Sequence, residues 1–265
     1  MTATRSRRIR AFLLHLSSSL LLAGGFAAAT YFLWYPSPLL AIQGGLSIIA
    51  LLLAVDTILG PLLTLLVFKP EKARRELATD ISVILALQLG AFAYGAHAVL
   101  SERPAFLAFA YSQFYVVRSG DVSGKAAAEV GDAPRFGALG PRVVFASIPD
   151  TALKNGTALL AAAMGDPSFA LDASRYRSKP DDRARLTRES LLAADVPLAV
   201  RSRVAELAVA SGTAADDVAL YQVLGRIAPA LAVLRLSDAK LLGILAIDRR
   251  GSAATLTAKS ASARR

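Results

Sequence analysis

Three long apolar runs lie within the first hundred residues and limit the folds that this chain can adopt. They cover residues 11–35, 39–68 and 81–100. Each run is near or above the roughly 20 apolar residues that an α-helix needs to cross the hydrocarbon core of a bilayer. We therefore expect a transmembrane module at residues 1–103, with helices at about 11–35, 46–68 and 81–100 and with Asp80 as a candidate cap of the third helix.

Basic residues flank these runs unevenly. Two clusters precede the first run and separate the second from the third: Arg5, Arg7, Arg8, Arg10, Lys69, Lys72, Arg74 and Arg75. Residues 36–45, between the first two runs, contain no Lys or Arg. The positive-inside rule then predicts a multi-pass membrane protein with its N-terminus in the cytoplasm and its C-terminal domain on the opposite side of the membrane.

The first run also permits a second interpretation, a cleaved signal peptide. Ala27-Ala28-Ala29 resembles a small-residue cleavage site after a basic segment. Thr30–Tyr35 continues the apolar run and ends it with aromatic residues suited to a membrane interface, which favours a retained helix. Cleavage would not change the predicted directions of the second and third helices.

Composition excludes several classes of function. The net charge is +10, and part of the excess flanks the apolar runs. The rest is scattered over the C-terminal domain, which also carries many acids, and shows no aromatic interleaving, so we expect no nucleic-acid partner. The chain has no cysteine, and its two histidines, His15 and His97, lie within apolar segments. No phosphate-binding loop or nucleophile elbow is present. We therefore expect no enzyme, no catalytic residue, no cofactor and no metal site.

The remainder of the chain predicts a soluble extracytoplasmic domain of mixed α/β (α+β) type at residues 104–250, followed by a disordered tail at 251–265. Aromatic and β-branched residues favour strands, whereas helical patterns follow proline and glycine breaks. We expect one or two strands at 105–117, a strand at 142–148 and a hairpin of 230–236 with 241–247. The expected helices are 151–164, 181–194, 199–211 and 214–224.

Pairs of acidic residues in this domain could suggest acid and base catalysis. Asp181-Asp182 and Asp216-Asp217 instead stand at the start of predicted helices, where carboxylates favour the positive end of the helix dipole. Arginines of the helix at 181–194 are expected to form a solvated face or to pair with Glu189. We interpret these acids as structural.

Asp56 is the most informative single residue of the apolar runs. An aspartate near the middle of a membrane helix costs roughly 3 kcal/mol on insertion scales and is usually retained for a functional or structural reason. With a rise of about 1.5 Å per residue, Asp56 lies about 18 Å from Phe68 along its helix. Tyr94 of the third run reaches a similar depth, so it is the predicted hydrogen-bond partner of Asp56.

Asp56 also belongs to a stripe of small and polar residues. Asp56, Gly60 and Thr64 follow one another at spacings of four and share one helix face, and Pro61 adds a kink. Such a stripe permits close approach of another helix. Two interpretations stay open: packing within the three-helix bundle, or docking of a partner's transmembrane helix.

Four segments resemble the type IV pilin accessory proteins, a family of the bacterial inner membrane. The resemblance covers roughly residues 8–118, and the segments that carry it are Val55–Pro70, Ala11–Leu16, Trp34-Tyr35-Pro36, and Gln88 through Tyr94-Gly95. Weaker counterparts are Tyr221–Arg226 and Leu241–Asp248. The family pattern tends to close with an aromatic residue, where this chain has Arg249-Arg250.

The resemblance implies a chaperone-like accessory protein without enzymatic activity. Its partner would be the type IV major pilin, whose helix waits in the lipid bilayer and whose head waits in the periplasm before pilus assembly. The oligomeric state stays open. An alternative from another class is a membrane-anchored sensor or signalling protein with a periplasmic ligand-binding domain.

Overall fold

The chain folds into two compact units in the computed structural model. The structure describes residues 2–69, 71–122, 140–149, 151–152, 155–157, 160, 164, 166–192 and 196–247. The first unit comprises Met1–Leu33 and Gly45–Glu102, and the second comprises Trp34–Gly44 and Arg103–Arg265.

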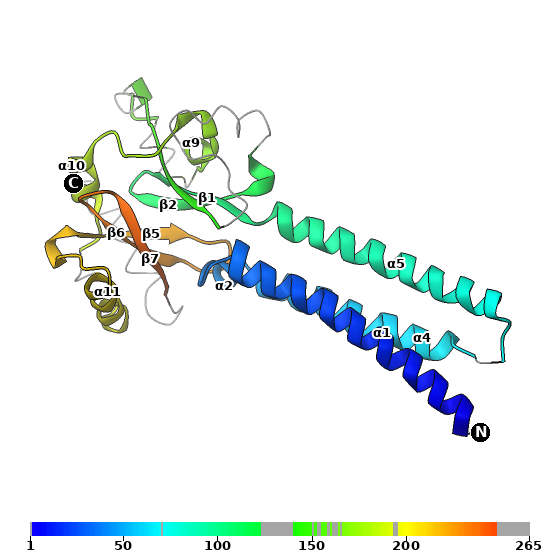
Figure 1. Ribbon diagram of the computed structural model, residues 1–265. Helices are drawn as coiled ribbons and strands as arrows, with labels where there is room; N and C mark the ends of the chain where they lie inside the picture. The colour runs from blue at the N-terminus through cyan, green and yellow to red at the C-terminus, as the bar shows by residue number, and fades with distance from the viewer. Residues whose placement is uncertain are drawn as a thin grey trace. The chain divides into compact units, whose positions relative to one another are not determined.

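Three long helices build the first unit (Figure 1). In chain order the elements are α1 (Thr2–Ala29) with a π-helical end (Thr30–Trp34), α3 (Gly45–Ala54), a π-helical segment (Val55–Leu59), α4 (Gly60–Val67) and α5 (Arg74–Ser101). Ser6–Trp34, Gly45–Val67 and Arg74–Ser101 are each long and apolar enough to cross a membrane, so the three predicted helices are present.

Two helices begin earlier than the apolar pattern predicts. α1 extends into the basic N-terminal segment, and α5 begins at Arg74. Arg, Leu and Glu favour helices, so helical structure continues beyond the apolar limits. Asp80 consequently lies inside α5 rather than at its cap, and its carboxylate accepts a 2.6 Å hydrogen bond from the Lys72 ammonium. This bond is the main cause of the raised pKa of Lys72.

The middle helix changes its winding at the centre. Val55–Leu59 forms a π-helical turn between α3 and α4, and Pro61 follows in the first turn of α4. Proline has no amide hydrogen to donate, which disturbs the regular ladder. The Thr57 hydroxyl donates to the Leu53 carbonyl at 2.6 Å and satisfies one backbone group in this region.

A seven-stranded mixed sheet forms the second unit. The strands are β1 (Pro104–Ala110), β2 (Gln113–Arg118), β3 (Arg142–Ala146), β4 (Tyr176–Arg177), β5 (Val218–Leu224), β6 (Ala230–Arg235) and β7 (Lys240–Ala246). Their spatial order is β4-β3-β1-β2-β5-β6-β7, with β1–β3 and β2–β5 parallel and the other pairs antiparallel. The predicted strands at 105–117 and 142–148 and the closing hairpin are therefore confirmed.

Both faces of this sheet are covered, which explains the uninterrupted apolar sequence of β1. On one face, Leu107 and Phe109 pack with Tyr221. On the other, Phe106 packs against Tyr176, and β6 packs with α11 (Leu198–Ala210). Figure 1 shows α9 (Ser168–Leu171) beside β1 and β2, and α11 beside β7.

Residues 34–44 are part of this core, although they precede the second apolar helix. The short helix α2 (Leu39–Ile42) buries Leu39 and Ile42 with Tyr221. The Ile227 amide donates to the Ile42 carbonyl at 2.9 Å. A Cβ on Gly225 would lie only 3.0 Å from that carbonyl oxygen, so glycine permits the close approach. The second unit thus includes a segment that the division at residue 103 assigned to the helical module.

One predicted helix is wrong. Residues 214–224 form only a 3-10 turn (Ala215–Asp217) before β5. β5 pairs with β2 on one side and with β6 on the other, and this tertiary pairing overrides a local sequence that suits a helix. The helices at 181–194 and 199–211 are present as α10 (Arg183–Glu189) and α11. Half of the residues of the helix predicted at 151–164 lie outside the described residues, and the tail at 251–265 lies wholly outside them.

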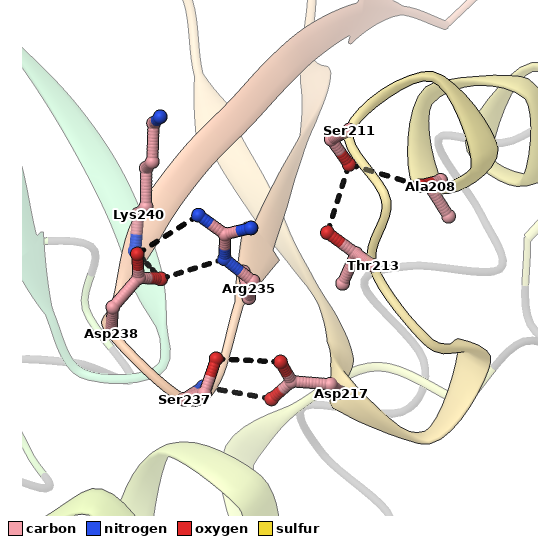
Figure 2. Close-up of polar contacts among 8 residues, drawn as sticks. All are labelled: Ala208, Ser211, Thr213, Asp217, Arg235, Ser237, Asp238 and Lys240. Atoms are coloured by element: carbon pink, nitrogen blue, oxygen red, sulfur yellow. Dashed lines mark hydrogen bonds and ion pairs between the residues drawn. The ribbon is translucent and has the colours of Figure 1, made fainter.

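Asp217 has a different structural role from the one predicted for it. Its carboxylate accepts bonds from the amide and hydroxyl of Ser237, at 2.7 and 2.6 Å, and so ties the start of β5 to the β6–β7 turn (Figure 2). Within that turn, Arg235 donates twice to Asp238 at 2.9 Å. The bond from Arg235 is the main reason why the pKa of Asp238 is lowered.

Candidate functional site

A buried polar network inside the three-helix unit is the candidate functional site, and Gln88 is at its centre. Gln88 lies on α5. Its amide nitrogen donates to the Ser19 hydroxyl on α1 and to the Asp56 carbonyl on the middle helix, both at 2.9 Å. Its amide oxygen lies 2.8 Å from the His15 Nε2 atom. One side chain therefore connects all three helices.

His15 extends the network from α1 to α4. The Gln88 oxygen can only accept, so the 2.8 Å contact requires the proton on the His15 Nε2 atom. In the neutral ring, Nδ1 then accepts from the Thr64 hydroxyl, 2.6 Å away. His15 and Ser19 are four residues apart and share one face of α1.

Gly60 makes room for this arrangement. A Cβ atom at residue 60 would overlap the terminal amide of Gln88. The absence of a side chain lets the amide reach the Asp56 carbonyl one turn earlier on the middle helix. Small residues at helix contacts serve this purpose between apolar helices, where close approach and hydrogen bonds hold the helices together.

The Asp56 carboxylate is the one part of this cluster that the network leaves out. Asp56 is only 3% exposed, yet neither carboxylate oxygen has a hydrogen-bond partner among the described residues. Gln88 binds the Asp56 backbone instead, and both of its amide hydrogens are used. Buried polar groups are normally satisfied, and an unsatisfied charged group is especially costly.

A small cavity adjoins this carboxylate. Its volume is about 120 Å³, and its lining combines the polar cluster with apolar side chains from α1 and α5: His15, Ser18, Ser19, Leu22, Asp56, Leu85, Gln88, Leu89 and Phe92. The Phe26 and Phe92 rings meet edge to face at 5.5 Å between centroids. Leu22, Leu85 and Leu89 are substantially exposed, so the cavity lies near the outer surface of the three-helix unit.

The predicted bond between Tyr94 and Asp56 is not formed. Tyr94 is 78% exposed, whereas Gln88 points into the unit. Six residues separate them on α5, which is a rotation of about 240° around the helix. The prediction considered only how deep Tyr94 lies along its helix and not this rotation, so it chose a residue on a face of α5 that does not point toward Asp56.

The stripe on the middle helix lies inside the unit. Asp56, Gly60, Pro61 and Thr64 are all buried. Gly60 is opposite Gln88, and Thr64 contacts His15. Of the two interpretations left open by the sequence, packing within the chain's own bundle accounts for the stripe at Gly60 and Thr64. Among the four residues of the stripe, all of which the structure describes, the Asp56 carboxylate has buried oxygens without a hydrogen-bond partner.

The basic clusters adjoin one end of the unit. An Arg8 guanidinium nitrogen donates to the Leu65 carbonyl at 2.7 Å, near the C-terminus of α4. Such carbonyls have no partner within the helix, and cations are favoured there by the helix dipole. This bond brings the N-terminal basic segment to the end of α4 that leads into Lys69 and Lys72.

The second unit has a cavity of its own, of about 250 Å³, beside the β1–β2 turn. Tyr111 and Ser112 form this turn with φ values of 51° and 68°, which is typical of a tight hairpin turn. Burial raises the pKa of Tyr111 to about 12. Asp181 and Arg185 also line the cavity.

The charged residues near this cavity are mostly paired, as the sequence predicts. Asp182 caps α10 by accepting from the Ala184 amide at 2.8 Å, and Arg185 pairs with Glu189 at 2.6 Å. Within the described residues, no group of three or more His, Cys, Asp or Glu side chains could hold a metal ion.

Comparisons with known proteins identify similar sequences. The family described as fimbrial assembly protein FimB matches residues 4–44, which include α1 and the segment buried in the sheet unit. Three curated relatives come from Dichelobacter nodosus. The fimbrial assembly protein of serogroup I is 36% identical over 111 residues, that of serogroups C1 and C2 is 35% identical over 111, and that of serogroup E1 is 32% identical over 109.

The similarity covers only part of this chain. The aligned residues are 42%, 42% and 41% of it, in the same order. They span 42% of the serogroup I and serogroup E1 proteins, but 82% of the protein from serogroups C1 and C2. No solved structure matches the chain.

We expect Gly60→Ala to weaken the three-helix unit. The new methyl group would displace the Gln88 amide and break its bonds to His15, Ser19 and the Asp56 carbonyl. Gly90→Ala is the matched control, because a Cβ there meets nothing within 4 Å. Thermal unfolding in detergent micelles should show Gly60→Ala to be less stable than Gly90→Ala by about 1–2 kcal/mol. Equal stabilities would contradict the network.

Proposed function

Because this chain belongs to the family of fimbrial assembly proteins, we propose that it is a non-enzymatic helper of type IV pilus assembly in the bacterial inner membrane. Its three apolar helices would span the bilayer, and its sheet unit would lie in the periplasm. Its partner would be the major pilin. The observation that carries this proposal is the 35% sequence identity to a fimbrial assembly protein over an alignment that spans 82% of that protein's length.

The architecture suits a partner that has one part in the membrane and another part in the aqueous compartment beside it. A pilin that awaits assembly has an apolar helix in the bilayer and a folded head outside it. The present chain combines three helices of spanning length with a mixed sheet unit. Residues 34–44 and residues from 103 onward belong to the same unit, so in the proposed arrangement the helix ends that lead into these residues would face one side of the membrane.

The distribution of basic residues supports the proposed orientation. Arg8 contacts the end of α4, and Lys72, which precedes α5, binds Asp80 within that helix. Positive residues favour the cytoplasmic side of a membrane. The opposite helix ends lead into the sheet unit, which supports the proposal that this unit lies in the periplasm.

A chaperone-like role needs surfaces for pilin and no reacting groups. In the described part of the sheet unit, Asp182 and Asp217 bind backbone amides, and Glu189 pairs with Arg185. These acids stabilise the fold of the unit. The cavity beside Tyr111 is a candidate contact for the pilin head.

The orientation can be tested with single cysteines, since the chain has none of its own. Glu71→Cys and Ala214→Cys both introduce a thiol at an exposed residue. In cells with a permeabilised outer membrane, a membrane-impermeant maleimide should label Ala214→Cys and should label Glu71→Cys only after the inner membrane is opened. The reverse pattern would place the sheet unit in the cytoplasm.

Deletion of the gene tests the function itself. We expect surface pili to be lost or strongly reduced while total pilin is still made, because the defect would lie in assembly rather than in synthesis. Electron microscopy of surface pili and immunoblotting of whole-cell pilin measure the two quantities. Restoration by a plasmid-borne copy is the control, and normal piliation of the deletion strain would refute the proposed function.

A further inference from the structure

The cavity beside Asp56 supports an inference about how a partner helix is recognised. Asp56 provides a buried carboxylate with two unpartnered oxygens. Leu22, Leu85 and Leu89 provide an apolar rim on α1 and α5. We propose that this rim receives an apolar helix of the pilin and that the helix brings a positively charged group to Asp56.

The hydrogen bonds around the cavity define what the site lacks. The Gln88 amide hydrogens bind Ser19 and the Asp56 carbonyl, and His15 is held by Gln88 and Thr64. Ser18 donates to carbonyls of its own helix. Because these donors are used in other hydrogen bonds, the Asp56 carboxylate can accept a hydrogen bond from a donor of another molecule. A cation satisfies it best, because charge-assisted hydrogen bonds are roughly twice as strong as neutral ones.

The shape of the site favours a helix over a free ion. An ion in a polar pocket needs several oxygen ligands, whereas four of the residues that line this cavity are the apolar Leu22, Leu85, Leu89 and Phe92. Leu22, Leu85 and Leu89 are 41–55% exposed on the unit's own surface, and an apolar helix would cover them. Packing of apolar side chains and one polar contact is the usual basis of association between membrane helices.

The inference names the part of pilin that the proposed function would engage, and it rests on that function. It also separates two roles within the middle helix. Gly60 and Thr64 face the chain's own helices, whereas the Asp56 side chain is directed to the partner. A helix bound here would contact α1 and α5 rather than the exposed leucines of α4.

Photocrosslinking in membranes tests this arrangement. The photoreactive residue p-benzoylphenylalanine is placed at Leu89 on the rim, or at Leu59 on the middle helix as a control of similar exposure. The photoreactive residue is introduced into the full-length protein, and the co-expressed major pilin is the partner whose crosslinking is measured. Crosslinking to pilin should occur at Leu89 and be weaker by about tenfold at Leu59, a ratio that corresponds to about 1.4 kcal/mol.

Substitutions of Asp56 test its charge. Asp56→Asn keeps the size of the side chain and should abolish most of the crosslinking at Leu89, whereas Asp56→Glu should retain much of it. Immunoblots verify equal amounts of each variant in the membrane. Equal crosslinking in Asp56→Asn, preference for Leu59, or a product that contains only a second copy of this chain would overturn the inference.

The same strains distinguish this inference from the proposed function. If the deletion strain loses surface pili but Leu89 does not crosslink to pilin, the proposed function stands and this site is rejected. If deletion leaves piliation normal, the proposed function itself fails.

Discussion

The three-helix unit depends on one half-buried amide, that of Gln88. Gln88 holds α1 through His15 and Ser19 and holds the middle helix through the Asp56 carbonyl. Apolar helices in a bilayer gain little from the hydrophobic effect when they associate, so close packing and such hydrogen bonds determine which faces meet. Gly60 allows the amide to reach this central position. The orientation of all three helices follows from these contacts.

The same arrangement explains why Asp56 is exceptional. Its backbone serves the network, while its carboxylate is left beside a cavity with an apolar rim. An aspartate that merely stabilised the bundle would be expected to bond within it. The proposed contact with a pilin helix gives this carboxylate a partner and links the internal architecture of the unit to assembly.

The sheet unit contributes in another way. It contains residues 34–44, so it is built from two separate parts of the chain. The family match at residues 4–44 includes both α1 and this buried segment. The region of similarity therefore contributes to both units, through His15 and Ser19 in one and Ile42 in the other.

Sequence patterns predicted the elements whose signals are local. The apolar runs identified three helices, and aromatic and β-branched residues identified β1, β2 and β3. The strand β5 was predicted to be a helix, because the secondary structure of these residues is determined by their pairing with two distant strands. Asp56 was recognised from its position in an apolar run. Gln88 and His15 are also polar residues within apolar runs. The rotation of each helix about its axis determines that they, and not Tyr94, lie beside Asp56, and this rotation cannot be obtained from the depth of a residue along its helix.

The central claim is that the Asp56 carboxylate serves pilus assembly and not the stability of the chain. The most direct measurement is the number of surface pili in a strain whose only copy carries Asp56→Asn, with the amounts of the variant and of pilin in the membrane verified. The account predicts that surface pili are lost while both proteins remain at their usual levels. Normal piliation in that strain would contradict it.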